Sequence, residues 1–240
     1  MIRAVGVVIP AADEEAAIGH CLDSVAEAVH RLREVRPDVQ VRTVVVLDGC
    51  TDRTREIVAG YEDVGAVVCS ARRAGAARRL GVEAALAHQP ASLDEMWLAN
   101  TDADSTVPPD WLVEQLSEAA GGAQVVLGTV LPQPGLMARV EQAWFDGHLL
   151  RAGHPHVHGA NLGIRADVYA DLGGWPNLAT GEDVLLARRA AARHIRIART
   201  ARIPVLTSVR TTARAPHGFA SFLGGLAARV ELTAAQEGAQ

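Results

Sequence analysis

Residues 44–54 read VVVLDGCTDRT, a β-branched apolar run that ends abruptly in acidic, glycine and threonine residues. The same arrangement occurs in VVIPAADEE (7–15) and in MWLANTDADS (96–105). Between such runs the apolar residues recur at helical spacing, as they do at Ile18, Leu22, Val25, Val29 and Leu32. Strands that alternate with helices predict an α/β fold with a mostly parallel sheet. Because such sheets bind ligands beyond the carboxyl ends of their strands, the three polar endings predict one binding edge.

The remaining pattern extends this fold along the whole chain without a linker or a repeat. We expect strands at 5–9, 41–47, 64–69 and 95–99, a helix that Pro37 ends, and helices at about 53–60, at about 73–88 and from 108–110 onward. Beyond the Gly pair at 121–122 we expect a strand at 123–131, a helix at 135–150, a strand or loop at 156–165, helices at about 166–172 and 182–193, and short strands at 195–197 and 205–206. One domain over residues 1–240 accommodates all of these elements.

Composition limits the partners, the phosphate-binding groups and the location of the protein. The net charge is −5 over 240 residues, so no basic field favours nucleic acid. Every one of the 23 basic residues is arginine, which leaves guanidinium groups, backbone N–H groups or a metal to hold a phosphate. Three cysteines at spacings that fit no zinc motif indicate reduced thiols. With neither a signal-peptide pattern nor a run of about 20 apolar residues, we expect a cytoplasmic protein without a transmembrane segment, free or at the inner face of the membrane.

The sharpest local pattern is Asp102-Ala103-Asp104-Ser105, directly after a predicted strand. In an extended segment residues two apart point the same way, so both carboxylates would reach one ligand. Two close carboxylates repel unless a cation lies between them, and a divalent cation bridging them to a diphosphate meets that need. The alternative is a solvated turn that leads into the next helix.

Two interpretations apply to ATGEDVLLARR (179–189). Thr180 and Asp183 have the spacing of a capping box, in which both side chains would satisfy backbone groups at the start of a helix. Alternatively, Asp183 is a general base at a helix N-terminus that faces the binding edge. The two roles are compatible with one another.

Arginine residues cluster around Gly75 in SARRAGAARRLG (70–81). A helix through this segment would place Arg72 and Arg79 on one face, two turns apart. A guanidinium in this segment, with Arg78 as the candidate, can pair with a diphosphate through two hydrogen bonds. The alternative is a solvated face whose arginine stems cover apolar surface.

Histidines form a second group of candidates. His154, His156 and His158 alternate and would share one face of a strand, which is a pattern that zinc can use. No acidic or cysteine partner is spaced with them, so we expect a polar wall of a second substrate site instead. His217, in the loop-like segment 207–219, is a candidate to close over a diphosphate or to bind a metal; a surface loop histidine is the alternative.

Taken in order, these motifs resemble the family 2 glycosyltransferases of the GT-A fold over roughly residues 3–225. VVIPAADEE is similar to the family's V-P-x-x-N-E-E, VVVLDGCTDRT to D-D-G-S-x-D-x-T, and AARRLG to A-R-N-x-G. DADS corresponds to the D-x-D element, GANLGIRADVYADLGGW to the acceptor segment, and GED to the E-D base motif. The chain departs from the pattern at Asp13, Leu47, Cys50 and Arg79.

The resemblance implies an inverting glycosyltransferase that uses Mn²⁺ or Mg²⁺ and a nucleotide-sugar donor, with UDP-sugars favoured over GDP-sugars. About 1–121 would bind the donor, and about 122–240, including a C-terminal helix, would bind an acceptor that is a small molecule, a lipid-linked molecule or a glycan. Asp183, with Glu182 beside it, would be catalytic, and Asp102, Asp104 and His217 would hold the metal. The donor-binding residues implied are Pro10, Ala11, Glu15, Asp48, Arg78, Asp102 and Asp104, and the acceptor-binding residues are Gly159, Ala160, Asn161 and Trp175.

Three other functions are compatible with parts of the sequence. A retaining GT-A glycosyltransferase would not need Asp183 as a base. A sugar-1-phosphate nucleotidyltransferase shares the layout and the metal, but it resembles G-G-x-G-T-R…K near the first strand, where this chain has PAADEEAAIGH and no lysine. A catalytically silent nucleotide-sugar-binding protein would not require Asp102, Asp104 and Asp183 together.

Overall fold

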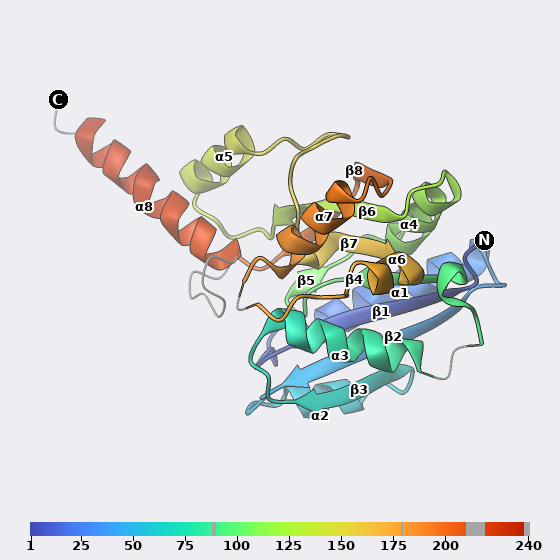
Figure 1. Ribbon diagram of the computed structural model, residues 1–240. Helices are drawn as coiled ribbons and strands as arrows, with labels where there is room; N and C mark the ends of the chain where they lie inside the picture. The colour runs from blue at the N-terminus through green and yellow to red at the C-terminus, as the bar shows by residue number, and fades with distance from the viewer. Residues whose placement is uncertain (88–89, 179, 210–218, 238–240) are drawn as a thin grey trace.

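A single mixed sheet organises the protein, of which the computed structural model describes residues 1–87, 90–178, 180–209 and 219–237 (Figure 1). Within these residues eight strands are hydrogen-bonded in the order β3-β2-β1-β4-β7-β6-β8-β5. The strands are β1 (Ala4–Ala11), β2 (Gln40–Asp48), β3 (Val64–Cys69), β4 (Met96–Asn100), β5 (Ser105–Thr106), β6 (Val125–Pro132), β7 (Leu162–Arg165) and β8 (Ile197–Thr207).

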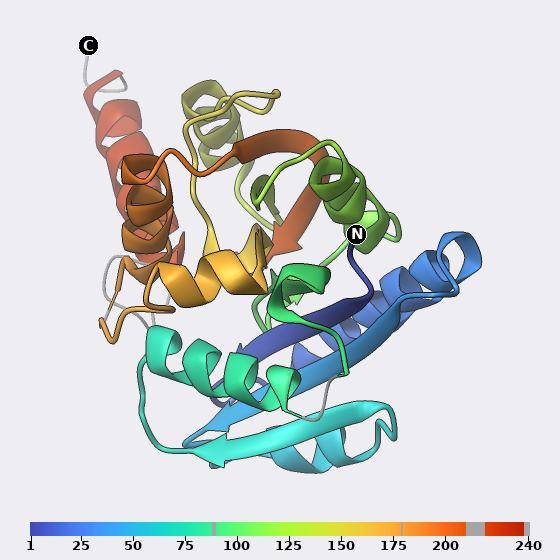
Figure 2. The ribbon, with the colours of Figure 1, turned by 45° about the vertical axis from the view of Figure 1, so that its right-hand side comes forward.

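Helices cover both faces of this sheet. The helices are α1 (Ile18–Val35), α2 (Thr54–Ala59), α3 (Ala74–Leu86), α4 (Trp111–Ala120), α5 (Ala138–Gly147), α6 (Ala166–Asp171), α7 (Glu182–Ala192) and α8 (Phe219–Glu237), with 3₁₀ turns η1 (Leu93–Glu95) and η2 (Gly159–Asn161). Helices α1, α2 and α4 share one core with the sheet. Helices α3, α6 and α7 share the other, on the opposite face (Figures 1 and 2).

The alternation of side chains along β1 explains these two cores. Val5, Val7 and Ile9 enter the core under α1, whereas Ala4 and Val8 enter the core under α3. Both sets are at most 1% exposed, because a parallel strand in the middle of a sheet is buried on each face. On α1 the buried residues recur at steps of three and four, and the helix ends two residues before Pro37.

The predicted α/β fold with a mostly parallel sheet is confirmed. β1 pairs with β2 and β4 in parallel, as β2 does with β3 and β6 with β8. β7 runs antiparallel to β4 and β6, and β5 runs antiparallel to β8. This arrangement brings the loops after β1, β2, β3 and β4 to the carboxyl edge of the parallel strands.

Several predicted boundaries differ from the structure. The two short strands predicted at 195–197 and 205–206 belong to one strand, β8, which begins at Ile197, and residues 198–200 between them also pair with β6. The helix predicted at about 73–88 begins at Ala74, so Arg72 precedes it with a left-handed φ of 49° and does not share a helix face with Arg79. Helix α1 begins at Ile18, so the acidic residues 13–15 precede it.

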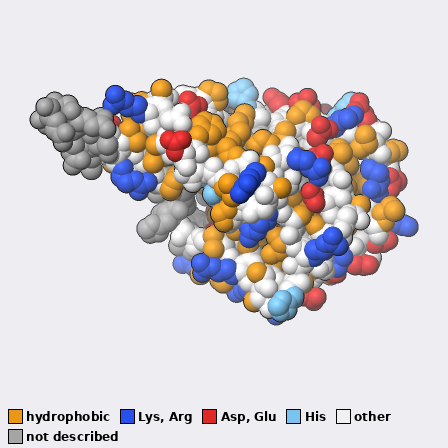
Figure 3. Space-filling view, turned by 90° about the horizontal axis from the view of Figure 1, so that it is seen from above, with side chains coloured by type: hydrophobic (Ala, Val, Ile, Leu, Met, Phe, Trp, Pro, Cys, Tyr) orange, Lys and Arg blue, Asp and Glu red, His pale blue; other side chains and the backbone are white. Residues whose placement is uncertain are grey.

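The final helix, α8, lies against α5 and projects beyond the rest of the molecule (Figure 1). The two helices pack through Val140 and Trp144 on α5 and Leu223 and Leu226 on α8. In the described part of the chain no helix has the length and apolar character needed to cross a membrane. Positive and negative side chains are both spread over the face drawn in Figure 3, and neither sign dominates it.

Candidate active site

The loops after β1 and β2 are tied together by carboxylate groups. Asp13 has a left-handed φ of 53°, and its Oδ1 accepts hydrogen bonds from the Thr51 and Asp52 amides at 2.5 and 3.2 Å. The Thr51 bond lowers the pKa of Asp13. In return the Glu15 amide donates to Asp52, and the Arg53 amide donates to Glu15, at 2.9 and 3.0 Å. Asp13 and Asp52 therefore join the two loops, and Asp52 also accepts the Thr54 amide at the start of α2 at 2.9 Å.

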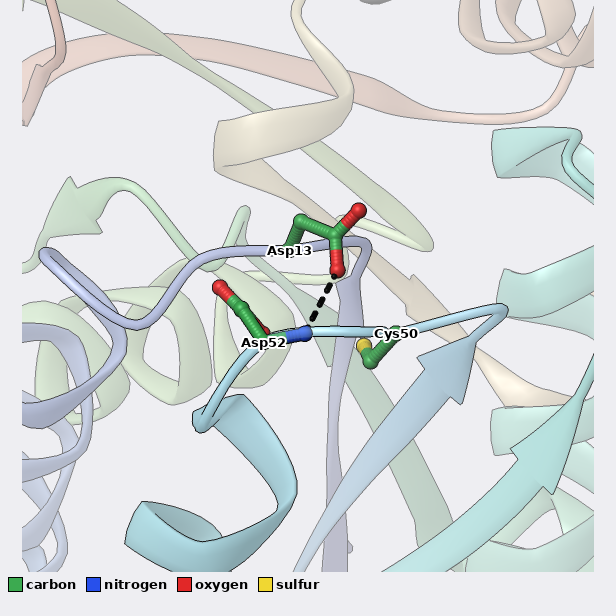
Figure 4. A group of neighbouring side chains, drawn as sticks. All are labelled: Asp13, Cys50 and Asp52. Carbon is green, nitrogen blue, oxygen red and sulfur yellow. Dashed lines mark hydrogen bonds between the residues drawn. The ribbon is translucent and has the colours of Figure 1, made fainter.

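Figure 4 shows Asp13 and Asp52 beside Cys50. The potential metal-binding atoms of these three side chains lie within 4.8 Å of one another. The Cys50 thiol donates to the Ala11 carbonyl at 3.3 Å, and the carboxylates are engaged by the loop amides. Hydrogen bonding within the loops accounts for this grouping.

Asp48 is the last residue of β2 and lies at the carboxyl edge of the sheet. It is 5% exposed, and its two carboxylate oxygens accept the amides of Arg72 and Arg73 at 2.8 and 3.1 Å. The carboxylate thus holds the loop that leads from β3 into α3. Pro10 is half-buried and Ala11 is buried at the end of β1, and both border the same edge. The predicted contacts of these residues with a nucleotide remain predictions.

Arg78 lies inside the molecule rather than on a solvated face of α3. It is 3% exposed, its Nη1 donates to Glu182 on α7, and its Nη2 donates to Asp102 at 2.5 Å. Its guanidinium carbon is 5.2 Å from the centre of the Trp175 ring. Two of its donors are taken by carboxylates, and the predicted contact of Arg78 with the donor diphosphate stays a prediction.

Asp102 and Asp104 lie in a turn between β4 and β5, not in an extended segment. The Ser105 amide closes the turn on the Asp102 carbonyl at 3.1 Å. Both side chains are half-buried at the carboxyl end of β4. Arg78 engages Oδ1 of Asp102, so Oδ2 is the oxygen that this carboxylate has for another cation.

Asp183 lies in the first turn of α7, where it bonds to a distant backbone group. Its Oδ2 accepts the Gly159 amide at 2.8 Å, and its Oδ1 accepts the Val184 amide at 2.7 Å. The predicted capping box is wrong, because Gly181, at a left-handed φ of 77°, is the residue that caps the helix. Glu182 is 7% exposed; burial raises its pKa, and Arg78 opposes that shift.

The predicted acceptor segment is largely internal. Asn161 is 1% exposed: its amide nitrogen donates to the carbonyls of Thr129 and Ile203, and its oxygen accepts from Trp111. Ala160 is also buried, and Gly159 donates to Asp183. The side chain of Asn161 therefore joins β6, β8 and α4, which corrects its expected role of contacting the acceptor.

Trp175 requires a similar correction. Its ring is 0% exposed and supports the Arg78 guanidinium. Its amide donates to the Tyr169 hydroxyl, and its carbonyl accepts from Arg79 at 3.0 Å. A fully enclosed ring offers no stacking surface to a sugar, so the role of Trp175 is to pack against Arg78.

The histidines form a stacked row instead of a metal site. His156 stacks between His154 and His158 with ring centres 5.6 and 6.0 Å apart, and on His148 at 5.0 Å. His148 in turn stacks on Trp144 at 4.1 Å. Burial lowers the pKa of His158 to about 3, so this ring is neutral at pH 7. The predicted role of His217 lies outside the described residues.

What the site brings together is a set of carboxylates around one guanidinium at the carboxyl edge of the sheet. The model of glycosyl transferase family 2 matches residues 6–171, which is more than half of the chain. The chain belongs to this family. The match contains the D-x-D turn and the loops after β1 and β2, and it ends before the E-D segment.

Several solved structures share the fold. The chain is similar to residues 1–349 of TarS from S. aureus, with 17% identity, a TM-score of 0.62, and coverage of 86% of this chain and 60% of that one. It is similar to the mannosyltransferase PcManGT from Pyrobaculum calidifontis in complex with GDP-Man and Mn²⁺, with 21% identity, a TM-score of 0.64, and coverage of 88% and 58%. It is also similar to glucosyl-3-phosphoglycerate synthase from Mycobacterium tuberculosis in complex with Mn²⁺, UDP and phosphoglyceric acid, with 21% identity, a TM-score of 0.54, and coverage of 95% and 76%.

These likenesses confirm the GT-A type of α/β fold for this family 2 member. The chain spans about three fifths of the length of the first two structures. No curated protein matches it by sequence.

Proposed function

We propose that this family 2 member transfers a sugar from a nucleotide-sugar donor to an acceptor hydroxyl with inversion, using a divalent cation. One observation carries the proposal: a single guanidinium, that of Arg78, contacts both Asp102 of the D-x-D turn and Glu182 of the E-D segment. The two motifs come from opposite halves of the chain. Their meeting at one point supports a common reaction centre.

The donor is assigned to the edge formed by the loops after β1, β2 and β3. Pro10, Ala11 and Glu15 border this edge, and Asp48 fixes the loop before α3. The similar structures that hold GDP-Man with Mn²⁺ or UDP with Mn²⁺ support a nucleoside diphosphate here. UDP-sugars are the favoured donors, and GDP-sugars are the alternative.

The chemistry of the turn between β4 and β5 fits a hard divalent cation. Asp104 and Oδ2 of Asp102 would hold Mn²⁺ or Mg²⁺, since both ions prefer carboxylate oxygens. The cation would neutralise the charge that develops on a leaving diphosphate. His217, which lies outside the described residues, is a third candidate ligand.

Asp183 is assigned the general base. The Gly159 and Val184 amides each bond one of its carboxylate oxygens and so fix the carboxylate plane. Each oxygen keeps a second lone pair, and an acceptor hydroxyl within hydrogen-bond distance would transfer its proton there. Attack by that oxygen from the face opposite the diphosphate inverts the anomeric carbon.

The first experiment is a thermal-shift screen of nucleotides and nucleotide-sugars with and without Mn²⁺. A ligand that binds only the folded protein raises the midpoint of unfolding by mass action. We expect UDP or GDP, with Mn²⁺, to do so. If no nucleotide shifts the midpoint under either condition, the assignment of the donor site fails.

The second experiment replaces Asp183 with Asn, which keeps the shape of the side chain but cannot take a proton. Turnover should fall by roughly 10²–10⁴-fold while the affinity for the donor is preserved. Asp63→Asn, an exposed acid outside the site, is the control. Unchanged turnover, or a product whose anomeric configuration by NMR is retained, would contradict the proposed mechanism.

A further inference from the structure

The Arg78 guanidinium is buried, and the whole residue is 3% exposed. Carboxylates of Asp102 and Glu182 accept from its two terminal nitrogens. The Trp175 ring lies against it, with 5.2 Å from the ring centre to the guanidinium carbon. A Cβ added to Gly159 would lie 2.6 Å from Nη2, so Gly159 also packs directly on the group.

Burial of this charge is costly unless it is paired. Burial acts to lower the pKa of Arg78, but the carboxylates of Asp102, Glu182 and Asp183 raise it further than burial lowers it. A planar guanidinium presents several donors in a fixed fork, so it can bond two carboxylates on different elements at once. A lysine ammonium would supply the charge from one point only. The site therefore needs the spaced donors of the guanidinium as well as its positive charge.

Two sets of contacts link Arg78 to Asp183, and close packing of α3 on α7 supports them. Glu182, its ion-pair partner, directly precedes Asp183 on α7. Gly159, which packs on the guanidinium, donates its amide to Asp183 at 2.8 Å. Gly75, on the same helix as Arg78, lies so close to α7 that an added Cβ would meet Glu182 at 3.2 Å. Helix α3 thus fixes the start of α7 by close packing and by charge.

We propose that Arg78 is a positioning residue: its guanidinium joins the Asp102 turn to the first turn of α7 and thereby sets the place of the Asp183 carboxylate. The inference rests on the proposed function for the role of Asp183 as general base, whereas the contacts of Arg78 come from the structure alone. Arg78 acts through Asp102, Glu182 and Gly159.

The first test needs no substrate. The exchange rate of the Gly159 amide proton, measured by NMR, reports the bond to Asp183. In Arg78→Lys this amide should exchange about tenfold faster than in wild type, whereas Arg55→Lys, an exposed change on α2, should leave it unchanged. Equal exchange in folded Arg78→Lys and wild type overturns the proposal.

A second test measures the energetic coupling between Arg78 and Glu182. The unfolding constants of Arg78→Met, Glu182→Gln and the double variant form a thermodynamic cycle. Because Arg78→Met leaves Glu182 buried without its cation, Glu182→Gln should recover part of the loss, with a coupling of about tenfold in the constant. Additive losses contradict the proposal.

The third test uses hydrolysis of UDP-glucose and GDP-mannose in the presence of Mn²⁺. Arg78→Lys should lower kcat roughly 100-fold, since small misplacement of a reacting group has effects of this size, and change KM by less than about threefold. A wild-type kcat in Arg78→Lys refutes positioning. If wild type hydrolyses neither donor, the proposed function is in doubt while the amide exchange and the cycle still decide the role of Arg78.

Discussion

Replacing Gly159 with Ala tests the packing of Gly159 on the Arg78 guanidinium. The added methyl carbon would lie 2.6 Å from Nη2 and 2.8 Å from Cζ of Arg78, well inside normal contact distance. The guanidinium cannot retreat, because Asp102 and Glu182 hold its nitrogens and Trp175 lies against it. The backbone at Gly159 must therefore move away.

The cost can be estimated from two terms. Inserting one methyl group into a packed interior costs about 1–3 kcal/mol. Moving the Gly159 amide weakens its bond to the Asp183 carboxylate, and hydrogen bonds to charged groups contribute about 1.5–3 kcal/mol. Moving the backbone reduces the steric cost of the methyl group but weakens the hydrogen bond, so the two costs do not add in full. We therefore expect a loss of about 2–4 kcal/mol in the free energy of unfolding.

Urea denaturation followed by tryptophan fluorescence measures this loss. Gly147→Ala is the matched control, since a Cβ at Gly147, at the end of α5, would meet nothing within 4 Å. We expect the control to lie within about 1 kcal/mol of wild type. If Gly159→Ala is also within about 1 kcal/mol of this control, the guanidinium is not held as rigidly as its contacts imply.

Three further outcomes are expected. Asp104→Ala should abolish the Mn²⁺-dependent part of UDP or GDP binding in calorimetry without unfolding the protein, and equal affinity in variant and wild type would remove Asp104 from the metal site. Asp48→Ala leaves the Arg72 and Arg73 amides without their acceptor, so it should cost about 2–4 kcal/mol in urea denaturation, against less than about 0.5 for the exposed Asp63→Ala. His158 has a pKa of about 3 in the folded protein, whereas in the unfolded chain it binds a proton near pH 6.5. Protonation between these pH values therefore favours the unfolded chain, and the free energy of unfolding decreases as the pH falls from 6.5 toward 3. The slope of stability against pH in that window should flatten in His158→Gln but not in the exposed His20→Gln.

The sequence predicted the fold well because local patterns determine most of it. Runs such as 44–54 pair an apolar strand with a polar ending, and the parallel sheet then gathers those endings at one edge. The D-x-D turn and the E-D helix were found in the same way. Each is a short segment whose residues lie next to one another in the chain.

The interior contacts of the site were not predictable from local patterns. Arg78 pairs with residues 24 and 104 positions away, and an arginine on a helix is normally solvated. Asn161 looks like a polar loop residue, yet its partners lie 32 to 50 positions away. The capping box was wrong because a left-handed glycine, Gly181, intervenes and takes the capping position.

The interlocked loops after β1 and β2 limit how this protein can be recombined with its relatives. Asp13 and Glu15 accept amides of residues 51–53, and Asp52 accepts an amide in return. A chimera that imports one loop alone would strand the amides of the other without acceptors. Grafting experiments that aim to change donor preference should therefore exchange the loops after β1 and β2 together.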